Sequence, residues 1–176
     1  MNFAAVLSAI SAEAERSSLR YAVIGGVALA ALGMPRTTLD VDIVADAAAQ
    51  PHLVAFLESL GFATLHRSHG YSNHLHRDAA LGRVDIVYVD VDTADQVFAA
   101  AQRLPGPGGI EIPVAAAEHL VAMKVLAMKN DPARALQELA DIRFLLSRPD
   151  VDRGRVRRYF EQHGMLERFE DVAKTL

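Results

Sequence analysis

Along the first two thirds of the chain, segments with helical spacing of apolar residues alternate with segments that have the spacing of strands. Residues 3–17 place apolar side chains at helical spacing, and residues 50–60 repeat that pattern before a closing glycine. Short runs with strand character lie between and after these helices, at residues 21–24, 39–44, 62–67, 72–77, 82–89 and 110–114. Interleaved strands and helices, with some strands joined as hairpins, predict an α/β (α+β) fold built on a mixed β-sheet flanked by helices.

Two further helices are predicted in this part of the chain. Residues 27–33 form a short helical pattern that ends at a glycine, and Pro35 then predicts a break. A second helix is expected from about residue 92 to Arg103. The remaining sequence is helical in pattern to its end, so we expect an α/β core over residues 1–114 and a C-terminal helical bundle over residues 115–176.

Composition narrows the class of protein only slightly. The net charge of −4 gives no overall basic field of the kind that marks general nucleic-acid binders, and the absence of cysteine excludes disulfides and thiolate metal sites. The longest apolar run, residues 23–34, is too short to span a bilayer, and residues 1–17 resemble an amphipathic helix rather than a signal peptide. We therefore expect a cytoplasmic protein without a membrane partner.

The segment 39–44 carries two acidic residues inside an apolar strand. Asp40 and Asp42 are two residues apart and share a face of that strand, where their charges repel. A divalent cation such as Mg²⁺ or Mn²⁺ would remove this repulsion, because it takes carboxylate and phosphate oxygens as ligands. Asp85 stands between apolar residues of the strand 82–89. If the two strands are neighbours, three carboxylates converge into a site suited to phosphoryl transfer.

A glycine pair precedes the acidic strand. Gly25 and Gly26 lie between the strand 21–24 and the short helix, where glycine would let a phosphate approach the backbone closely. Each feature alone has a simpler explanation: a Gly-Gly pair is commonly a tight turn, and an Asp-x-Asp pair commonly decorates an exposed strand. Their combination favours a nucleotide-binding site.

These motifs resemble a known family. The stretch GGVALAALGMPRTTLDVDIV together with RVDIV is similar to the minimal nucleotidyltransferases of the DNA polymerase beta superfamily, and its R-x-T-x-D-x-D wording resembles the AbiEii-type toxin nucleotidyltransferases of type IV toxin–antitoxin systems. The resemblance implies that Asp40, Asp42 and Asp85 are the metal-binding and catalytic carboxylates. It further implies that Gly25 and Gly26 hold the phosphates of a nucleoside triphosphate (NTP).

The resemblance extends to residues outside the acidic cluster. It implies that Arg36 and Thr38 position the loop or the phosphates, that Lys124 contacts the triphosphate, and that Asp141 holds the helical half near the site. The family has Lys-Asp where this chain has Gln137-Glu138, so one positive charge is absent and Glu must serve for Asp. Without the resemblance, the simpler interpretation of Lys124 is a lysine that extends from an apolar helix to the surface.

Two other groups of residues permit different interpretations. The histidines of the two strands around Gly70 have no partner set that would complete a zinc shell, so surface or substrate-facing positions are favoured for His66, His69, His74 and His76. The arginine-rich stretch 143–158 is more simply a solvated helix face, although it would suit RNA contacts in an enzyme that acts on RNA.

Three functions remain open on the sequence. The first is Mg²⁺-dependent transfer of a nucleoside monophosphate from an NTP to a tRNA 3′ end or a protein side chain, by the toxin of a toxin–antitoxin pair with a cognate antitoxin. The second is a non-catalytic nucleotide- or partner-binding module on the same fold. The third is a nucleotidyltransferase for a small molecule of the aminoglycoside type, whose acceptor pocket could use Asp78, Glu111 and Glu118.

Overall fold

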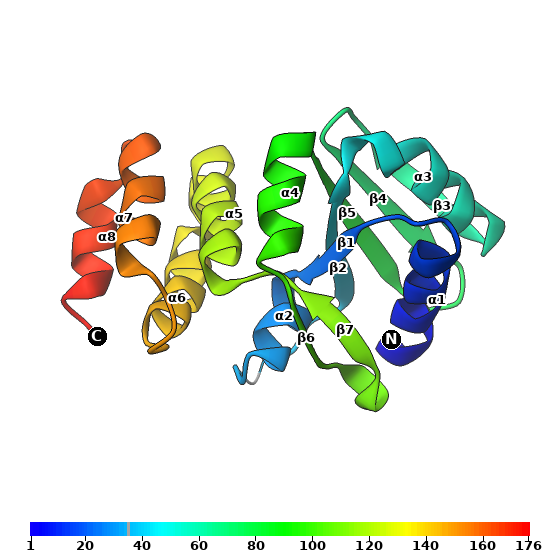
Figure 1. Cartoon of the computed structure of the whole chain (residues 1–176), viewed down its shortest axis with the longest axis horizontal. Coiled ribbons are helices and arrows are strands. Elements are labelled where there is room, and N and C mark those ends of the chain that lie inside the picture. Colours follow the sequence, from blue (N-terminus) through cyan, green and yellow to red (C-terminus); the bar gives the residue numbers. More distant parts are fainter. Residues whose placement is uncertain (35) are drawn as a thin grey trace. The chain divides into compact units, whose positions relative to one another are not determined.

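The computed structural model describes residues 1–34 and 36–176, and its contacts divide the chain into two compact units (Figure 1). The first unit, Met1–Ala115, contains every strand of the described chain, and the second, Ala116–Leu176, is helical. The break expected at Pro35 lies outside the described residues. That residues 1–114 and 115–176 are separate domains stays a prediction.

A seven-stranded mixed sheet forms the centre of the first unit, in the order β3-β4-β5-β2-β1-β7-β6. Two neighbouring pairs, β2 with β5 and β1 with β7, are parallel, and the other pairs are antiparallel. The mixed sheet expected from the sequence is therefore confirmed. The strands are β1 (Tyr21–Ile24), β2 (Asp40–Asp46), β3 (Phe62–Arg67), β4 (Tyr71–His76), β5 (Arg83–Val89), β6 (Gln102–Pro105) and β7 (Glu111–Val114).

Two helices, α1 (Phe3–Arg16) and α3 (Gln50–Ser59), cover the same face of this sheet (Figure 1). Ser11 of α1 contacts the hydroxyl of Tyr21, and Tyr21 lies opposite Ala45, an odd number of residues from Asp42. Since successive side chains of a strand point to opposite faces, α1 lies on the face away from the acidic residues. His52 of α3 contacts Glu13 of α1, which ties the two helices together.

The core of the first unit fills the space between these helices and the sheet. Leu7, Ile10, Ile43, Leu57 and Ile86 are almost wholly buried. Each such side chain contributes about 2 kcal/mol of transfer free energy when it leaves water. The carboxylate-bearing strand β2 is thus anchored by apolar residues on one face and carries its acids on the other.

Two helix boundaries differ from the expected ones. Helix α2 (Gly25–Ala31) begins at the glycine pair instead of after it. Helix α4 (Val91–Ala99) ends before Arg103, because the chain there forms β6, which pairs with β7. The hairpin between them is closed by the 3₁₀ turn Pro107–Gly109, where Gly108 and Gly109 take positive φ angles. The earlier 3₁₀ turn, Ala47–Ala49, leads into α3.

The second unit packs four helices: α5 (Ala117–Asn130), α6 (Ala135–Leu146), α7 (Arg153–Gln162) and α8 (Leu166–Ala173). A 3₁₀ turn, Pro132–Arg134, joins α5 to α6. Buried apolar residues of the helices, among them Val125, Ile142, Leu145 and Phe160, form its interior. Among the described residues, no helix has both the length and the apolar character needed to cross a membrane.

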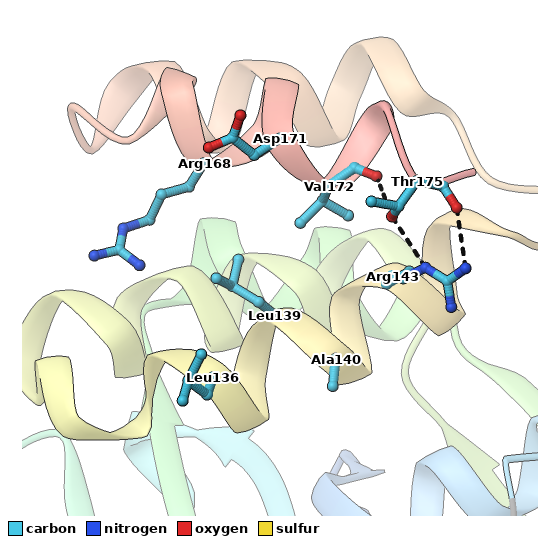
Figure 2. Close-up of a pocket in the computed structure, with 8 residues that line it drawn as sticks. All are labelled: Leu136, Leu139, Ala140, Arg143, Arg168, Asp171, Val172 and Thr175. Carbon is cyan, nitrogen blue, oxygen red and sulfur yellow. Dashed lines mark hydrogen bonds between the residues drawn. The ribbon is translucent and has the colours of Figure 1, made fainter.

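A shallow groove of about 390 Å³ runs between α6 and α8 of this unit (Figure 2). Leu136, Leu139 and Val172 give it apolar walls. At one end Arg143 donates hydrogen bonds to the side-chain and backbone oxygens of Thr175, which ties the C-terminal segment to α6.

Candidate active site

The structure brings Asp40, Asp42 and Asp85 together on one face of the sheet. Asp40 and Asp42 come from β2 and Asp85 from its parallel neighbour β5, where Asp42 and Asp85 are directly opposite each other. One carboxylate oxygen from each residue lies within 4.8 Å of the others. Among the described residues this is the only acidic or histidine-containing group close enough to hold a metal ion.

Three carboxylates this close repel one another. Two unit charges 4.8 Å apart cost about 3 kcal/mol in surroundings with an effective dielectric constant of about 20. Part of this cost is offset locally, because Arg83 donates from Nε to Asp85 Oδ1 at 2.8 Å and the Thr38 hydroxyl donates to Asp40 Oδ1 at 2.7 Å. Asp85 is buried, whereas Asp40 and Asp42 are partly exposed, so the group opens toward solvent on the β2 side.

Arg83 and Tyr71 surround the buried carboxylate. The hydrogen bond to Asp85 raises the pKa of the Arg83 guanidinium, which therefore stays charged. Burial raises the pKa of the Tyr71 phenol, and the charge of Asp85 raises it further, so this hydroxyl keeps its proton and can donate. Sequence reasoning missed both residues. Arg83 precedes Asp85 by two positions on a strand, and this alternation places it on the same face.

The glycine pair lies against the acidic strand. Gly25 has φ +63°, and a Cβ added there would overlap the carboxylate of Asp42. A Cβ at Gly26 would come within 2.5 Å of the Thr38 side chain. Close packing therefore requires both glycines, and the positive φ angle adds a second requirement at Gly25. Because Ile24 lies opposite Asp42, the chain turns at Gly25 directly beside the carboxylates.

Thr38 borders the acidic group, and both Arg36 and Thr38 line a separate pocket. Thr38 contacts Asp40 through its hydroxyl. The pocket that Arg36 and Thr38 line has a volume of about 360 Å³. The other walls of this pocket are apolar and come from Phe3, helix α2 and the turn after β6. The loop that precedes β2 thus holds one of the carboxylates in place through Thr38.

Lys124 and Asp141 are partners within the second unit. The Lys124 ammonium donates to Asp141 Oδ2 at 2.6 Å and to Glu138 Oε2 at 2.8 Å, and all three side chains are largely buried. Lys124 is therefore not a lysine that merely extends into solvent. Glu138, which stands where the family pattern has Asp, also pairs with Arg134. The expected triphosphate contact of Lys124 and the expected anchoring role of Asp141 stay predictions.

The histidines of β3 and β4 differ from one another. His74 is fully buried on the face away from the carboxylates, where it contacts the hydroxyls of Ser72 and Thr64. The expected surface or substrate-facing position of His74 was therefore wrong, and burial lowers the pKa of its imidazole. His66 and His69 are exposed, and His76 contacts the backbone of Leu60 and Asp78. A β-strand pattern alone does not reveal this burial, because α3 covers only one face of the hairpin.

The donor set fits a small, hard cation. All three ligands are carboxylates, the group that Mg²⁺ and Mn²⁺ prefer, and the described residues place no histidine or sulfur ligand among them. The close approach of the three oxygens makes a cation the simplest way to neutralise the group. Asp40, Asp42 and Asp85 would hold it, and the exposed side of the group would leave positions for phosphate oxygens.

Comparisons with known proteins identify the family and the fold of the chain. A family model described as the nucleotidyl transferase AbiEii toxin of a type IV toxin–antitoxin system matches residues 5–175. A comparison with curated proteins found no match. The fold is similar to the solution structure of the antibiotic-resistance factor ANT(2″)-Ia, with a TM-score of 0.70 at 16% identity, over 99% of this chain and 98% of that one.

Two further solved structures share the fold. Lincosamide antibiotic adenylyltransferase LnuA, bound to lincomycin, has a TM-score of 0.55 at 20% identity, over 81% of this chain and 95% of that one. An antigenic nucleotidyltransferase-like protein from Paracoccidioides brasiliensis has a TM-score of 0.60 at 16% identity, over 97% of this chain and 89% of that one. The chain is a nucleotidyltransferase, and it belongs to the AbiEii toxin family.

Proposed function

We propose that this enzyme transfers a nucleoside monophosphate from an NTP to a hydroxyl group at the 3′ end of an RNA such as tRNA, with a divalent cation, Mg²⁺ or Mn²⁺, held by Asp40, Asp42 and Asp85. The observation that carries the proposal is the approach of these three carboxylates within 4.8 Å, from two adjacent parallel strands. In the proposed reaction the acceptor oxygen forms a bond to the α-phosphorus, and the bond to pyrophosphate breaks.

Each residue of the site would have its own role in the proposed reaction. The turn at Gly25 and Gly26 would receive the triphosphate, because Gly25 lies directly beside the Asp42 carboxylate. Thr38 holds the Asp40 carboxylate, and Arg83 holds that of Asp85. Asp85 would accept the proton of the attacking hydroxyl. The bound cation would supply charge stabilisation at the reacting phosphate.

The direct test is an incubation with each labelled NTP, total tRNA and Mg²⁺. We expect label in the tRNA with the wild-type protein and none with Asp42→Ala or with excess chelator. A protein acceptor would instead give labelled protein in the same gel. Failure of all four NTPs to label either macromolecule would exclude the proposal.

The non-catalytic alternative makes a different prediction for nucleotide binding. A nucleotide-binding module that does not use the carboxylates should be stabilised by NTP whether or not Mg²⁺ is present. The proposed enzyme should show thermal stabilisation by NTP only with Mg²⁺, because the triphosphate then shares the cation with the three carboxylates. Metal-independent stabilisation would favour the module.

A small-molecule acceptor is the second candidate function. It is supported by the similarity in fold and length to ANT(2″)-Ia, one of whose structures contains adenylyl-2″-tobramycin. Two of the acids suggested for a cationic acceptor are already engaged, because Asp78 accepts from the amide of Ala80 and Glu118 from the amide of Asp152. Labelled product with tobramycin or lincomycin, and none with tRNA, would decide for this candidate.

We further propose that the activity makes the protein the toxin of a pair that includes a cognate antitoxin, as the family description suggests. Expression of the wild-type chain alone should slow the growth of a bacterial host, and expression of Asp42→Ala should not. Equal growth of both cultures at equal protein levels would contradict the toxin role and would leave the transferase activity to be judged by the labelling assay.

A further inference from the structure

Two of the three carboxylates, those of Asp42 and Asp85, belong to a longer row of side chains that crosses five strands. Ile24 lies opposite Asp42, Asp42 opposite Asp85, Asp85 opposite Asn73, and Asn73 opposite His66. Directly paired residues of neighbouring strands point to the same face of a sheet. The row therefore runs from the glycine turn on β1, through the carboxylates on β2 and β5, to Asn73 on β4 and His66 on β3.

The β4 end of this face is open to a ligand. Ser72 and His74, which point to the opposite face of β4, are fully buried. Tyr71, Asn73 and Leu75 point to the carboxylate face, and all are partly or largely exposed. His66 is exposed, and its ring centroid lies 6.3 Å from that of Tyr71. The face beyond Asp85 therefore presents an amide and two aromatic rings side by side.

The Asn73 amide oxygen is buried and has no hydrogen-bond partner among the described residues. A buried polar atom without a partner is costly, and the terminal torsion of asparagine is soft enough for the amide to turn toward a donor. Neighbouring strands are about 4.8 Å apart, so a hydroxyl above β5 and β4 can reach both Asp85 and Asn73. This is the position that an acceptor hydroxyl needs.

The direction of approach follows from the chemistry of the proposed reaction. In phosphoryl transfer the attacking and leaving oxygens lie on opposite sides of the phosphorus, roughly in line. If the triphosphate lies at the Gly25–Gly26 turn, the pyrophosphate leaves on the β1 side. The attacking hydroxyl must then come from the other side of the carboxylates, which is the side of Asn73 and His66.

We propose that Asn73, Tyr71 and His66 form the acceptor subsite, in which Asn73 positions the attacking hydroxyl beside Asp85 and the His66 and Tyr71 rings stack against the terminal nucleoside of the acceptor. This inference rests on the proposed nucleotidyl transfer.

The test compares two exposed histidines of the same hairpin, His66→Ala and His69→Ala, with tRNA, Mg²⁺ and labelled NTP. We expect His66→Ala to raise the KM for tRNA about tenfold, the size of a lost stacking contact, with an unchanged KM for NTP. His69→Ala should match the wild type in both constants. Asn73→Ala should lower kcat, and its Mg²⁺-dependent stabilisation by NTP should be unchanged. Equal effects of the two histidine substitutions, or a raised KM for NTP, would overturn the subsite.

A binding measurement separates this inference from the proposed function. The imidazole proton signals of His66 and His69, assigned from the two alanine variants, can be followed by NMR while adenosine is added to millimolar concentration. We expect the His66 signal to move and the His69 signal to stay, even if the wild-type protein labels no tRNA. Transfer to tRNA with a stationary His66 signal and an unchanged KM in His66→Ala would retain the enzyme and exclude the subsite.

Discussion

Asp42 on β2 and Asp85 on β5 are directly opposite each other across a parallel strand pair, with Asp40 beside them. Apolar residues on the other face of both strands fix this arrangement, because Ile43 and Ile86 are wholly buried. The fold itself therefore brings the three carboxylates together. The repulsion between their charges reduces the free energy of unfolding. The three carboxylates therefore lower the stability of the metal-free protein, although the proposed activity requires them.

We predict that Asp42→Asn abolishes transfer but stabilises the metal-free protein. Removing one charge relieves repulsion of about 3 kcal/mol per pair, and each kcal/mol is worth about 2–4 °C in Tm for a protein of this size. Loss of the cation should lower activity at least about 100-fold. Thermal unfolding with chelator and with Mg²⁺, alongside the labelling assay, checks both effects.

The control for this variant is Asp92→Asn, which removes a charge from an exposed position at the start of α4. It should leave activity and the Mg²⁺-dependent shift in Tm unchanged. A metal-free Tm of Asp42→Asn well below that of the wild type would show that repulsion is not what the three carboxylates contribute to stability.

We predict that Gly25→Ala and Gly33→Ala have a similar cost in stability but different effects on activity. Both glycines have positive φ angles, at which alanine costs about 1 kcal/mol. A Cβ at Gly33 meets nothing within 4 Å, whereas one at Gly25 overlaps the Asp42 carboxylate. Both variants should therefore lose some stability, but only Gly25→Ala should lose transfer and Mg²⁺-dependent NTP binding.

Chemical unfolding and the labelling assay report the two properties independently. If Gly25→Ala kept full activity with the same loss of stability as Gly33→Ala, the close approach of the turn to Asp42 would have no part in catalysis.

Much of this architecture can be predicted from the sequence because strand alternation is a local property. The positions of Asp40 and Asp42 on one face follow from their spacing, and β1, β2 and β5 follow from β-branched runs. Strand β6 could not be predicted in this way, since Gln102–Pro105 has no strand pattern of its own and depends on pairing with β7. Long-range pairing overrides local propensity there.

The residues around the three carboxylates are brought there by contacts between strands, which a sequence pattern does not contain. The place of Asn73 beside Asp85 becomes visible only when the neighbours of β5 are known, because the strand order places β4 on one side and β2 on the other. His74 shows the same limit, since its burial depends on which face α3 covers. Strand alternation and the family resemblance both pointed to the three carboxylates, but neither pointed to Tyr71 and Asn73 beside them.

We predict that Lys124→Met destabilises the protein by about 3–5 kcal/mol, because it leaves Glu138 and Asp141 buried without their shared cation. Combination with Glu138→Gln and Asp141→Asn should recover a large part of that loss, since the two uncompensated charges are then removed. Equilibrium unfolding in urea measures both changes. Full stability in Lys124→Met together with a raised KM for NTP would instead favour a triphosphate contact as the main role of this lysine.

The last prediction concerns the buried carboxylate of Glu13, which joins α1 to α3. The hydrogen bond from His52, followed by that from Ser17, lowers the pKa of Glu13 from its ordinary value of 4.5 to about 2. A lowered pKa in the folded state stabilises the protein above pH 4.5, and this contribution is lost as the pH falls from about 4.5 toward 2. Glu13→Gln should therefore have a lower Tm than the wild type at pH 7, and the difference should narrow between pH 4.5 and pH 3. Glu15→Gln, an exposed neighbour on the same helix, is the matched control and should follow the wild type throughout. A difference for Glu13→Gln that stays constant from pH 7 to pH 3 would mean that packing, and not the ionised carboxylate, holds the two helices together.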